Sequence, residues 1–518
     1  MMKKTLLATA LCGLLSSTLF SAVLPNEQTS SSWYTDAQTS LEQKINHIKK
    51  TTKAKNVILF VGDGMGISTV TASRILDGQN KGDSGEENVL SFGAFPYSGL
   101  VKTYNTNAQT ADSAGTMTAM ASGIKTKIGV IGVNEFGARA NCAESLDNDV
   151  ITIMELAERE GKATGVVSTA RLTHATPAAT YAHSPERNWE NNSKLPQEAL
   201  DNGCEDIAAQ FISFDYGDGI DVAMGGGRRE FIPNTVTDVE GKNGKRTDGR
   251  DLRVEWKSAN VDGAYVETQA EFDAIDASNT SKLFGLFNYS HMQYEADRAN
   301  DVAGEPSLSE MTSKAIEVLQ NNDEGFVLMV ESGRVDHAHH AGNAYNALED
   351  TIELSKAVAA ADALTNDEDT LIIVTADHSH VFTIAGYPKR GNPILGKVQG
   401  INSDGSGKVT DDLADDAMPY TTLGYANGNG FHDLGAETNA DAGYDEAIHM
   451  SGRVDLSAID TTTPGFHQEA TVPRSSETHA GEDIAIYAKG PGAHYAQGVM
   501  EQNVVFHIIN TAADLGAK

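Results

Sequence analysis

Carboxylate and imidazole side chains stand beside several apolar runs of the sequence. Asp63 comes directly after the run VILFVG, and Glu331 comes directly after FVLMV. Asp377 and His378 follow LIIVTA in the same way, and His479 shortly precedes IAIYA. Carboxylates that gather at one place repel each other, and buried polar groups need partners. A bound metal ion is therefore the economical explanation for such a set of side chains.

Two more candidate ligands lie in the stretch VESGRVDHAHH. Asp336 lies five residues after Glu331, and His340 lies four residues after Asp336. Each fragment alone has a simpler explanation, because an aspartate after a strand is usually a turn residue or a helix cap. HAHH could likewise be a solvated histidine cluster. The combination of these fragments favours a metal site over the simpler alternatives.

Ser113 lies in TADSAGTMTAMASG, a stretch whose alanine, methionine and threonine content predicts a helix after the serine. A hydroxyl at the N-terminus of that helix would lie where backbone N–H groups and the helix dipole favour an anion. Ser113 could instead be an N-cap, which is the commoner role of a serine before a helix. A metal ion beside the oxygen would favour a nucleophile, because it would lower the pKa of the hydroxyl.

Apolar runs alternate with helical patterns from about residue 54 onward. ATGVVS (163–168) and IDVAM (220–224) predict further strands, while residues 150–160 and 307–320 predict helices. This alternation predicts an α/β fold, with a mostly parallel central sheet covered by helices on both faces. Open sheets of this kind place their ligand sites at the carboxyl ends of the strands, where the acidic and histidine residues stand.

The N-terminus predicts export to the periplasm or the medium. Residues 1–22 are typical of a signal peptide, because Lys3 and Lys4 precede an apolar run from Leu6 to Phe20. A membrane anchor is the alternative, although this run is short for a bilayer span. The C-terminal sequence does not resemble the hydrophobic tail of a glycolipid-anchored protein, so we expect no membrane anchor.

The remaining chain divides by composition into four segments. Residues 23–53 predict a flexible stretch followed by an amphipathic arm helix that begins near Trp33. Residues 54–385 carry the first part of the α/β domain, and residues 477–518 carry its last part. Residues 386–476 are rich in Gly, Asn, Asp and Thr and contain few long apolar runs, which predicts a surface insertion.

The cysteines allow one intramolecular pair. Cys12 lies in the predicted signal peptide, which leaves Cys142 and Cys204. An oxidising compartment would allow these two to form a disulfide, and two buried free thiols are the alternative.

Acidic residues outnumber basic ones by 72 to 39, which gives a formal net charge of -33. This excess argues against binding to nucleic acid or to an anionic membrane. It also predicts a salt-tolerant or halophilic form, because salt screens the repulsion among surface carboxylates. An ordinary acidic exported protein is the alternative, since net charge affects solubility and does not determine the fold.

Several motifs occur in the order found in alkaline phosphatases: GDGMG, TADSAGT, HATPAA, VESGRVDHAHH, TADHSHVF and ETHAGED. The sequence resembles the animal branch of that family, from about Trp33 to about residue 510. The resemblance implies hydrolysis of phosphate monoesters, a homodimer in which the arm reaches the partner, and a crown-like insertion at residues 386–476. Cys142 and Cys204 match a pair that is bridged in the animal enzymes.

The resemblance also implies two zinc ions and one magnesium ion. The first zinc would be held by Asp336, His340 and His479, the second zinc by Asp63, Asp377 and His378, and magnesium by Asp63, Thr176 and Glu331. Nitrogen-rich sites suit zinc, whereas an oxygen-only site suits magnesium, so the residue types agree with this assignment.

Ser113 matches the serine that becomes phosphorylated in this family, and Arg187 matches the arginine that clamps two phosphate oxygens. Asp112 would hold the Arg187 guanidinium. His174 and His337 match positions that tune the magnesium site and the water network beside the phosphate. An imidazole there would let zinc compete with magnesium.

The animal enzymes carry a further calcium site, whose positions are occupied here by Glu240, the Phe287 carbonyl, Asn288 and Glu305. Asn288 replaces a glutamate of the family and Glu305 replaces an aspartate. The resemblance thus implies a calcium site that keeps oxygen ligands and loses one negative charge.

Other function classes explain the sequence less completely. Sulfatases need a Cys or Ser followed by Pro and Arg at fixed spacing, which DSAGT lacks, and phosphodiesterases usually lack the third-metal ligands. A periplasmic phosphate- or zinc-binding protein without turnover would explain the ligands but not a serine among them.

Overall fold

The computed structural model describes residues 24–516 and divides into two compact units, Met1–Ile48 and Lys49–Lys518. The predicted signal peptide, residues 1–22, lies outside the described residues. In the first unit, α1 (Asn26–Thr29) is followed by α2 (Ser32–Asn46), which lies in the predicted arm. No helix in residues 24–516 has the length and apolar character needed to cross a membrane.

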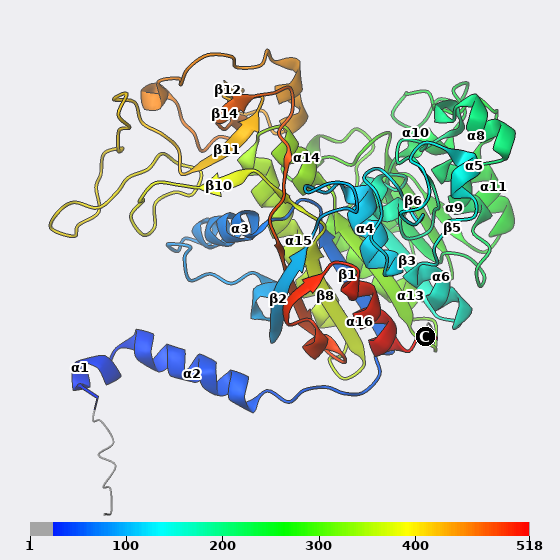
Figure 1. Cartoon of the computed structure of the whole chain (residues 1–518), viewed down its shortest axis with the longest axis horizontal. Helices are drawn as coiled ribbons and strands as arrows, with labels where there is room; N and C mark the ends of the chain where they lie inside the picture. The colour runs from blue at the N-terminus through cyan, green and yellow to red at the C-terminus, as the bar shows by residue number, and fades with distance from the viewer. Residues whose placement is uncertain (1–23, 517–518) are drawn as a thin grey trace, which may run out of the picture. The chain divides into compact units, whose positions relative to one another are not determined.

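A ten-stranded sheet forms the centre of the second unit (Figure 1). Its strands, in spatial order, are β17 (Gly498–Glu501), β2 (Tyr97–Lys102), β16 (Ile484–Lys489), β8 (Thr370–Ala376), β1 (Asn56–Gly62), β7 (Phe326–Ser332), β3 (Ala163–Arg171), β4 (Val222–Gly226), β6 (Leu283–Asn288) and β5 (Ala264–Val266). Every pairing is parallel except those of β16 with β2 and β8. The mostly parallel sheet predicted from the sequence is therefore confirmed.

Two groups of helices cover this sheet. In one group, α13 (Leu308–Leu319) packs on α15 (Ala344–Leu364), and both contact β7. In the other group, α4 (Ser113–Ser122) packs on α6 (Ile153–Arg159) and α16 (Val504–Ala513). Strand β1 contacts both α15 and α16, and all of its residues are buried. Covering on both faces explains why β1, β7 and β8 read as nearly unbroken apolar runs.

The second unit contains nine further α-helices in its described residues. They are α3 (Ile67–Asn80), α5 (Cys142–Ser145), α7 (Ala175–Ala178), α8 (Gln197–Asn202), α9 (Ile207–Ser213), α10 (Arg228–Phe231), α11 (Leu252–Ala259), α12 (Gln269–Asp273) and α14 (Arg334–His340).

Side-chain caps set where the predicted helices begin. The helix predicted at residues 150–160 begins only after Thr152, because Thr152 and Glu155 form a capping box. Ser307 and Glu310 form the same box before α13. Each box satisfies two backbone N–H groups that the first turn of a helix leaves without a partner.

Residues 386–476 carry small sheets of their own. β11 (Leu423–Gly428) pairs with β10 (Phe382–Ile384) and with β14 (Ala470–Pro473), and β12 (His432–Asp433) pairs with β13 (Phe466–His467). None of the strands within residues 386–476 joins the ten-stranded sheet.

The chain segments on either side of this insertion meet at its base. β9 (Ser379–His380) pairs antiparallel with β15 (His479–Ala480), and the register sets His380 opposite His479. Residues that are about a hundred positions apart in the sequence are thereby brought together.

Cys142 and Cys204 form a disulfide, as the family resemblance implies. The bridge lies in a small apolar cluster with Trp189 and Ala199, and the Glu198 carboxylate accepts hydrogen bonds from the backbone N–H groups of Cys142 and the next residue. The bridged residues are 62 positions apart, so a crosslink removes much conformational freedom from the unfolded chain.

Replacing both cysteines by serine is expected to lower the free energy of unfolding by roughly 4 kcal/mol, the loop-closure value for a bridge of this span. Denaturant unfolding followed by tryptophan fluorescence measures the loss, because Trp189 is only 4% exposed beside the bridge. An unchanged midpoint, or free thiols in the exported wild type by mass spectrometry, would contradict this expectation.

Candidate metal centre

The carboxyl ends of three adjacent strands bring the acidic residues together. β1 lies between β8 and β7, and all three run parallel. In the register of these strands, Val61 lies beside Glu331, and Gly62 lies beside Ala376. Asp63 and Asp377, the next residues in each chain segment, therefore project at the same edge as Glu331. The edge predicted from the sequence is the one where these side chains meet.

Asp336, His340 and His479 form the first cluster. Helix α14 places Asp336 and His340 one turn apart, and β15 supplies His479. The Oδ1 atom of Asp336 lies 3.3 Å from His340 Nε2 and 3.4 Å from His479 Nε2, and the two Nε2 atoms lie 3.1 Å apart. Ligands at zinc-bond lengths around a tetrahedral ion are separated by about 3.3 Å. The three atoms thus have the spacing of a zinc site.

Backbone carbonyls fix the two histidines of this cluster for metal binding. His340 Nδ1 lies 2.7 Å from the Glu477 carbonyl oxygen, and His479 Nδ1 lies 2.7 Å from that of Ala111. A carbonyl accepts only, so each Nδ1 is the protonated nitrogen of its ring. Each Nε2 then presents a lone pair, and two lone pairs that face each other need a cation between them.

The second cluster consists of Asp63, Asp377, His378 and Ser113. His378 Nε2 lies 3.4 Å from both Asp63 Oδ1 and Asp377 Oδ2, and 3.2 Å from Ser113 Oγ. Ser113 Oγ lies 3.4 Å from Asp63 Oδ1. These separations again match the edges of a tetrahedron around zinc, about 3.3 Å, with Ser113 Oγ at one corner.

A third group is made of oxygens without hydrogen-bond partners. Asp63 Oδ2, Thr176 Oγ1 and Glu331 Oε1 are buried and have no partner in the described chain. His174 Nδ1 is buried and unpaired in the same way, and His174 lies near the Asp63 and Glu331 carboxylates. Buried polar atoms are normally satisfied, so these three unpaired oxygens fit the ligand set of a cation. Oxygen ligands suit magnesium.

The electrostatics of the edge demand the same cations. Burial, together with the charges of Asp377, Asp336 and Glu331, raises the pKa of Asp63 well above its usual value. Burial also raises the pKa of Glu331 to about 7. Burial lowers the pKa of His378 well below its usual value, so this imidazole is neutral and able to bind a metal. Bound cations would neutralise the carboxylates without protons.

Asp112, and not Ser113, caps helix α4. Asp112 Oδ1 accepts a hydrogen bond of 3.1 Å from Gly115 N, and Ser113 is the first residue of the helix. The alternative that Ser113 is an N-cap is therefore wrong. Asp112 Oδ2 also accepts from Arg187 Nη1 at 3.0 Å and from Gly129 N at 2.9 Å. One carboxylate thus fixes both the helix that presents Ser113 and the guanidinium of Arg187.

His174 and His337 lie together, with a third histidine that the sequence did not single out. The ring centroids of His174 and His337 are 5.4 Å apart, and His291 lies 4.1 Å from His337. Burial, with Arg334 nearby, lowers the pKa of His337 to about 3, and burial also lowers the pKa of His174 and His291. The group is therefore neutral. His291 lies three residues after the end of β6, and the apolar run LFGLF of that strand was the available signal.

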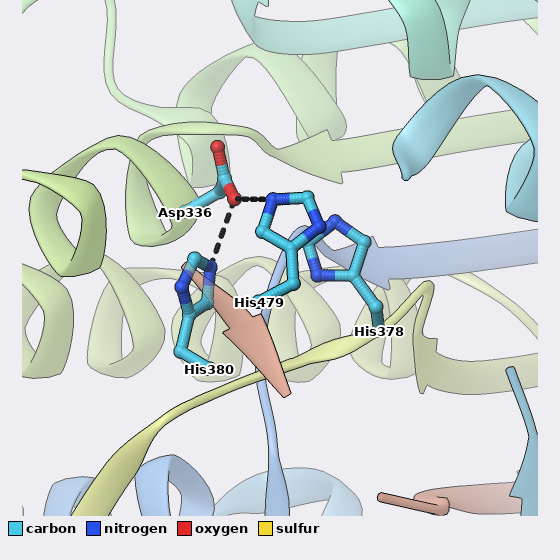
Figure 2. A group of neighbouring side chains, drawn as sticks. All are labelled: Asp336, His378, His380 and His479. Atoms are coloured by element: carbon cyan, nitrogen blue, oxygen red, sulfur yellow. Dashed lines mark hydrogen bonds and ion pairs between the residues drawn. The ribbon is translucent and has the colours of Figure 1, made fainter. Parts of the chain in front are cut away.

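Two further residues, His380 and Glu477, contact the first cluster, although the sequence analysis did not select them as site residues. Figure 2 shows His380 beside Asp336, His378 and His479. His380 Nε2 lies 2.8 Å from Asp336 Oδ1, and His380 Nδ1 bonds to Glu477 Oε2. Burial alone would lower the pKa of His380, but the carboxylates of Glu477 and Asp336 raise it to about 10. Its place two residues after His378, in DHSH, was the available signal.

The calcium candidates lie together only in part. Asn288 Nδ2 donates to Glu305 Oε2 and to Asp301 Oδ2, both at 3.2 Å. Glu240 Oε1 accepts from Tyr289 N, next to Asn288, at 2.8 Å, and it also pairs with the fully buried Arg228 guanidinium, which already supplies a positive charge. Burial raises the pKa of Glu305 to about 8. Asp301 is a carboxylate of this group that the family resemblance did not include, and Phe287 precedes Asn288, the last residue of β6.

A sequence profile described as alkaline phosphatase matches residues 54–515. The chain belongs to the alkaline phosphatase family. It is 43% identical to the tissue-nonspecific alkaline phosphatase of Gallus gallus, over 99% of this chain and 94% of that protein. The corresponding isozyme of Homo sapiens is also 43% identical, over 94% of this chain and 88% of its own length. These relatives support alkaline phosphatase activity rather than diester or sulfate ester hydrolysis.

Solved alkaline phosphatase structures share the fold. The crystal structure of the Thermus thermophilus enzyme covers 96% of this chain and 97% of its own, with a TM-score of 0.62 and 24% identity. The enzyme from the Antarctic bacterium TAB5 covers 90% of this chain and 100% of its own, with a TM-score of 0.58 and 24% identity. Both likenesses concern the fold, which agrees with the sheet of this alkaline phosphatase.

Removal of divalent metal from this alkaline phosphatase is expected to abolish activity and to lower the melting temperature. Without cations, the carboxylates of Asp63, Asp377 and Glu331 repel each other in a buried site. Zinc together with magnesium should restore both properties. Chelation followed by metal analysis, calorimetry and an activity assay tests this expectation, and full activity in metal-free protein would contradict it.

Proposed function

We propose that this alkaline phosphatase hydrolyses phosphate monoesters through a phosphoserine at Ser113. The observation that carries the proposal is the position of Ser113 Oγ, which lies 3.2 Å from His378 Nε2 and 3.4 Å from Asp63 Oδ1. A serine at one corner of a zinc polyhedron is in reach of both a metal and a bound phosphate. A non-catalytic binding site would need no hydroxyl there.

The residue sets fit two zinc ions and one magnesium ion. Asp336, His340 and His479 would hold the first zinc, Asp63, Asp377 and His378 would hold the second, and Asp63, Thr176 and Glu331 would hold magnesium. When bound, the ions would lower the pKa of the serine hydroxyl and neutralise charge on the phosphate and the leaving oxygen.

Magnesium is the proposed ion of the third site, because three of the unpaired protein atoms at that site are oxygens. Two variants of the TAB5 enzyme carry aspartate or glutamate in place of a histidine, and both are described as having Mg bound in the M3 site. His174 Nδ1 faces the corresponding group here, so zinc would compete with magnesium at this position.

The protein groups carry out a two-step displacement. Ser113 Oγ attacks phosphorus, its bond to phosphorus forms, and the bond to the alcohol oxygen breaks as the alcohol leaves with a proton. Water then attacks the phosphorus of the phosphoserine, the bond between Ser113 Oγ and phosphorus breaks, Ser113 Oγ takes up a proton from that water, and inorganic phosphate is released. Positioning and charge neutralisation supply most of the rate enhancement in such a transfer.

Arg187 is the proposed clamp for the phosphate oxygens. Its Nη1 is held by Asp112, and its Nη2 lies 3.2 Å from His174 Nε2, so the guanidinium plane is fixed before substrate binds. The N-terminus of α4 adds backbone N–H groups beside Ser113. Because these contacts all address phosphate, the organic part of the substrate should matter little.

Several further features belong to the proposal. A disulfide is typical of exported proteins, so we infer a periplasmic or secreted enzyme. A homodimer would cover Trp33, Leu41 and Ile45 of α2, which are 70%, 56% and 70% exposed. The insertion at residues 386–476 would be the counterpart of the animal crown. Calcium would bind near Asn288 and Glu305.

Replacing Ser113 by alanine is expected to remove the phosphoenzyme and to lower kcat by several orders of magnitude, because no other hydroxyl occupies that corner. The metal content should stay unchanged, since the side chains of Asp63, Asp377 and His378 remain. Acid quenching with labelled phosphate, followed by peptide mapping, measures the adduct. Covalent phosphate on a serine of the mutant would refute the assignment.

Salt is expected to raise the melting temperature of the metal-saturated enzyme. Loss of Lys3 and Lys4 with the signal peptide would leave 37 basic against 72 acidic residues. The screening length falls from about 30 Å at 0.01 M salt to about 3 Å at 1 M, which relieves repulsion at the surface. Calorimetry from about 0.01 to 2 M NaCl tests this. A flat or falling midpoint would favour an ordinary acidic enzyme.

A further inference from the structure

Glu477 is a buried carboxylate on the segment that returns from the insertion to the sheet. It is 1% exposed and lies two residues before His479. Its Oε1 atom accepts a hydrogen bond of 2.8 Å from Val381 N, and its Oε2 atom accepts one from His380 Nδ1. Its ion-pair partners in the described chain are the histidines His340 and His380. No lysine or arginine of residues 24–516 forms an ion pair with it.

These contacts lead to two ligands of the proposed first zinc site. His380 Nε2 lies 2.8 Å from Asp336 Oδ1, so the side chain of Glu477 reaches Asp336 through one imidazole ring. The backbone carbonyl of Glu477 accepts from His340 Nδ1 at 2.7 Å. Pairing of β9 with β15 holds His380 opposite His479. Glu477 is thus connected to Asp336 by its side chain and to His340 by its backbone.

We propose that Glu477 is a positioning residue for the first zinc site, acting through His380 on the orientation of Asp336. The inference rests on the proposed function, because it takes Asp336, His340 and His479 as zinc ligands. Partners of metal ligands fix the direction of the ligand lone pairs, and their loss typically lowers metal affinity about 10- to 100-fold.

Only a carboxylate can serve both contacts of Glu477. Its two oxygens accept simultaneously from Val381 N–H and His380 Nδ1–H. A glutamine amide has one acceptor oxygen, so Glu477→Gln must lose one of these hydrogen bonds while keeping nearly the same shape. If the amide oxygen stays on Val381, the amide NH2 faces His380 Nδ1, so the charge-assisted hydrogen bond from Nδ1–H to a carboxylate is replaced by a weaker one to a neutral ring. His380 then holds Asp336 less firmly.

The first experiment compares zinc affinity in Glu477→Gln and in Glu469→Gln, by competition with a chromophoric zinc chelator. Glu469 lies on the same returning segment and pairs with Arg453, but it contacts none of the proposed ligands. The expected result is a zinc affinity about 10- to 100-fold weaker in Glu477→Gln and unchanged in the control. Equal affinity in the two variants would overturn the proposal.

A double-mutant cycle tests whether Glu477 acts through His380. His380→Asn keeps a donor near Glu477 and removes the contact with Asp336, so its loss of zinc affinity should equal that of Glu477→Gln. The double variant should lose no more than either single variant. Losses that add independently would overturn the route through His380.

If Glu477→Gln does not fold, the His380→Asn variant alone tests the proposal. A zinc affinity in that variant equal to the wild-type value would then overturn the proposal.

Two further measurements separate this proposal from a fold defect and from the proposed function. The rise in melting temperature that zinc produces should be smaller in Glu477→Gln than in the wild type. An equal rise in the two proteins, with only the metal-free values differing, would make Glu477 structural and overturn the inference. Asp336→Asn removes a proposed ligand, so unchanged zinc affinity there refutes the zinc site itself. Loss in Asp336→Asn with none in Glu477→Gln refutes only the role of Glu477.

Discussion

Repulsion among buried carboxylates at one sheet edge is the constraint on which the rest of the structure depends. The parallel register of β8, β1 and β7 places Asp63, Glu331 and Asp377 where water cannot screen them. Cations would neutralise this group, and burial keeps the imidazole of His378 neutral and able to bind one. Metal binding should therefore stabilise this edge.

The same edge depends on segments that are distant in the sequence. Helix α14, which follows β7, carries Asp336 and His340, whereas His479 lies after the insertion in the sequence. Pairing of β9 with β15 closes the base of that insertion and sets His479 in place. A change in the insertion can therefore reach the proposed zinc ligands through Glu477 and His380. Ser476, the last residue of the insertion, also donates a hydrogen bond to the His340 carbonyl at 3.4 Å.

Asp112 shows how one side chain serves two structural demands. It caps α4 and pairs with Arg187, so the helix that presents Ser113 and the proposed phosphate clamp share one anchor. The serine is thereby free of a capping role, and its oxygen faces His378 and Asp63 instead. The position of Ser113 thus depends on a neighbour that also holds the proposed phosphate clamp.

The sequence by itself determined the parallel sheet and the proposed ligands, because buried strands read as apolar runs and their ends are marked by Asp, Glu and His. The tertiary structure alone decided which groups support those ligands. His291, His380 and Glu477 lie within three residues of a strand end or a candidate ligand, but their partners lie on other segments. Hydrogen bonds between distant segments leave no local periodicity in a sequence, so only the folded chain reveals them.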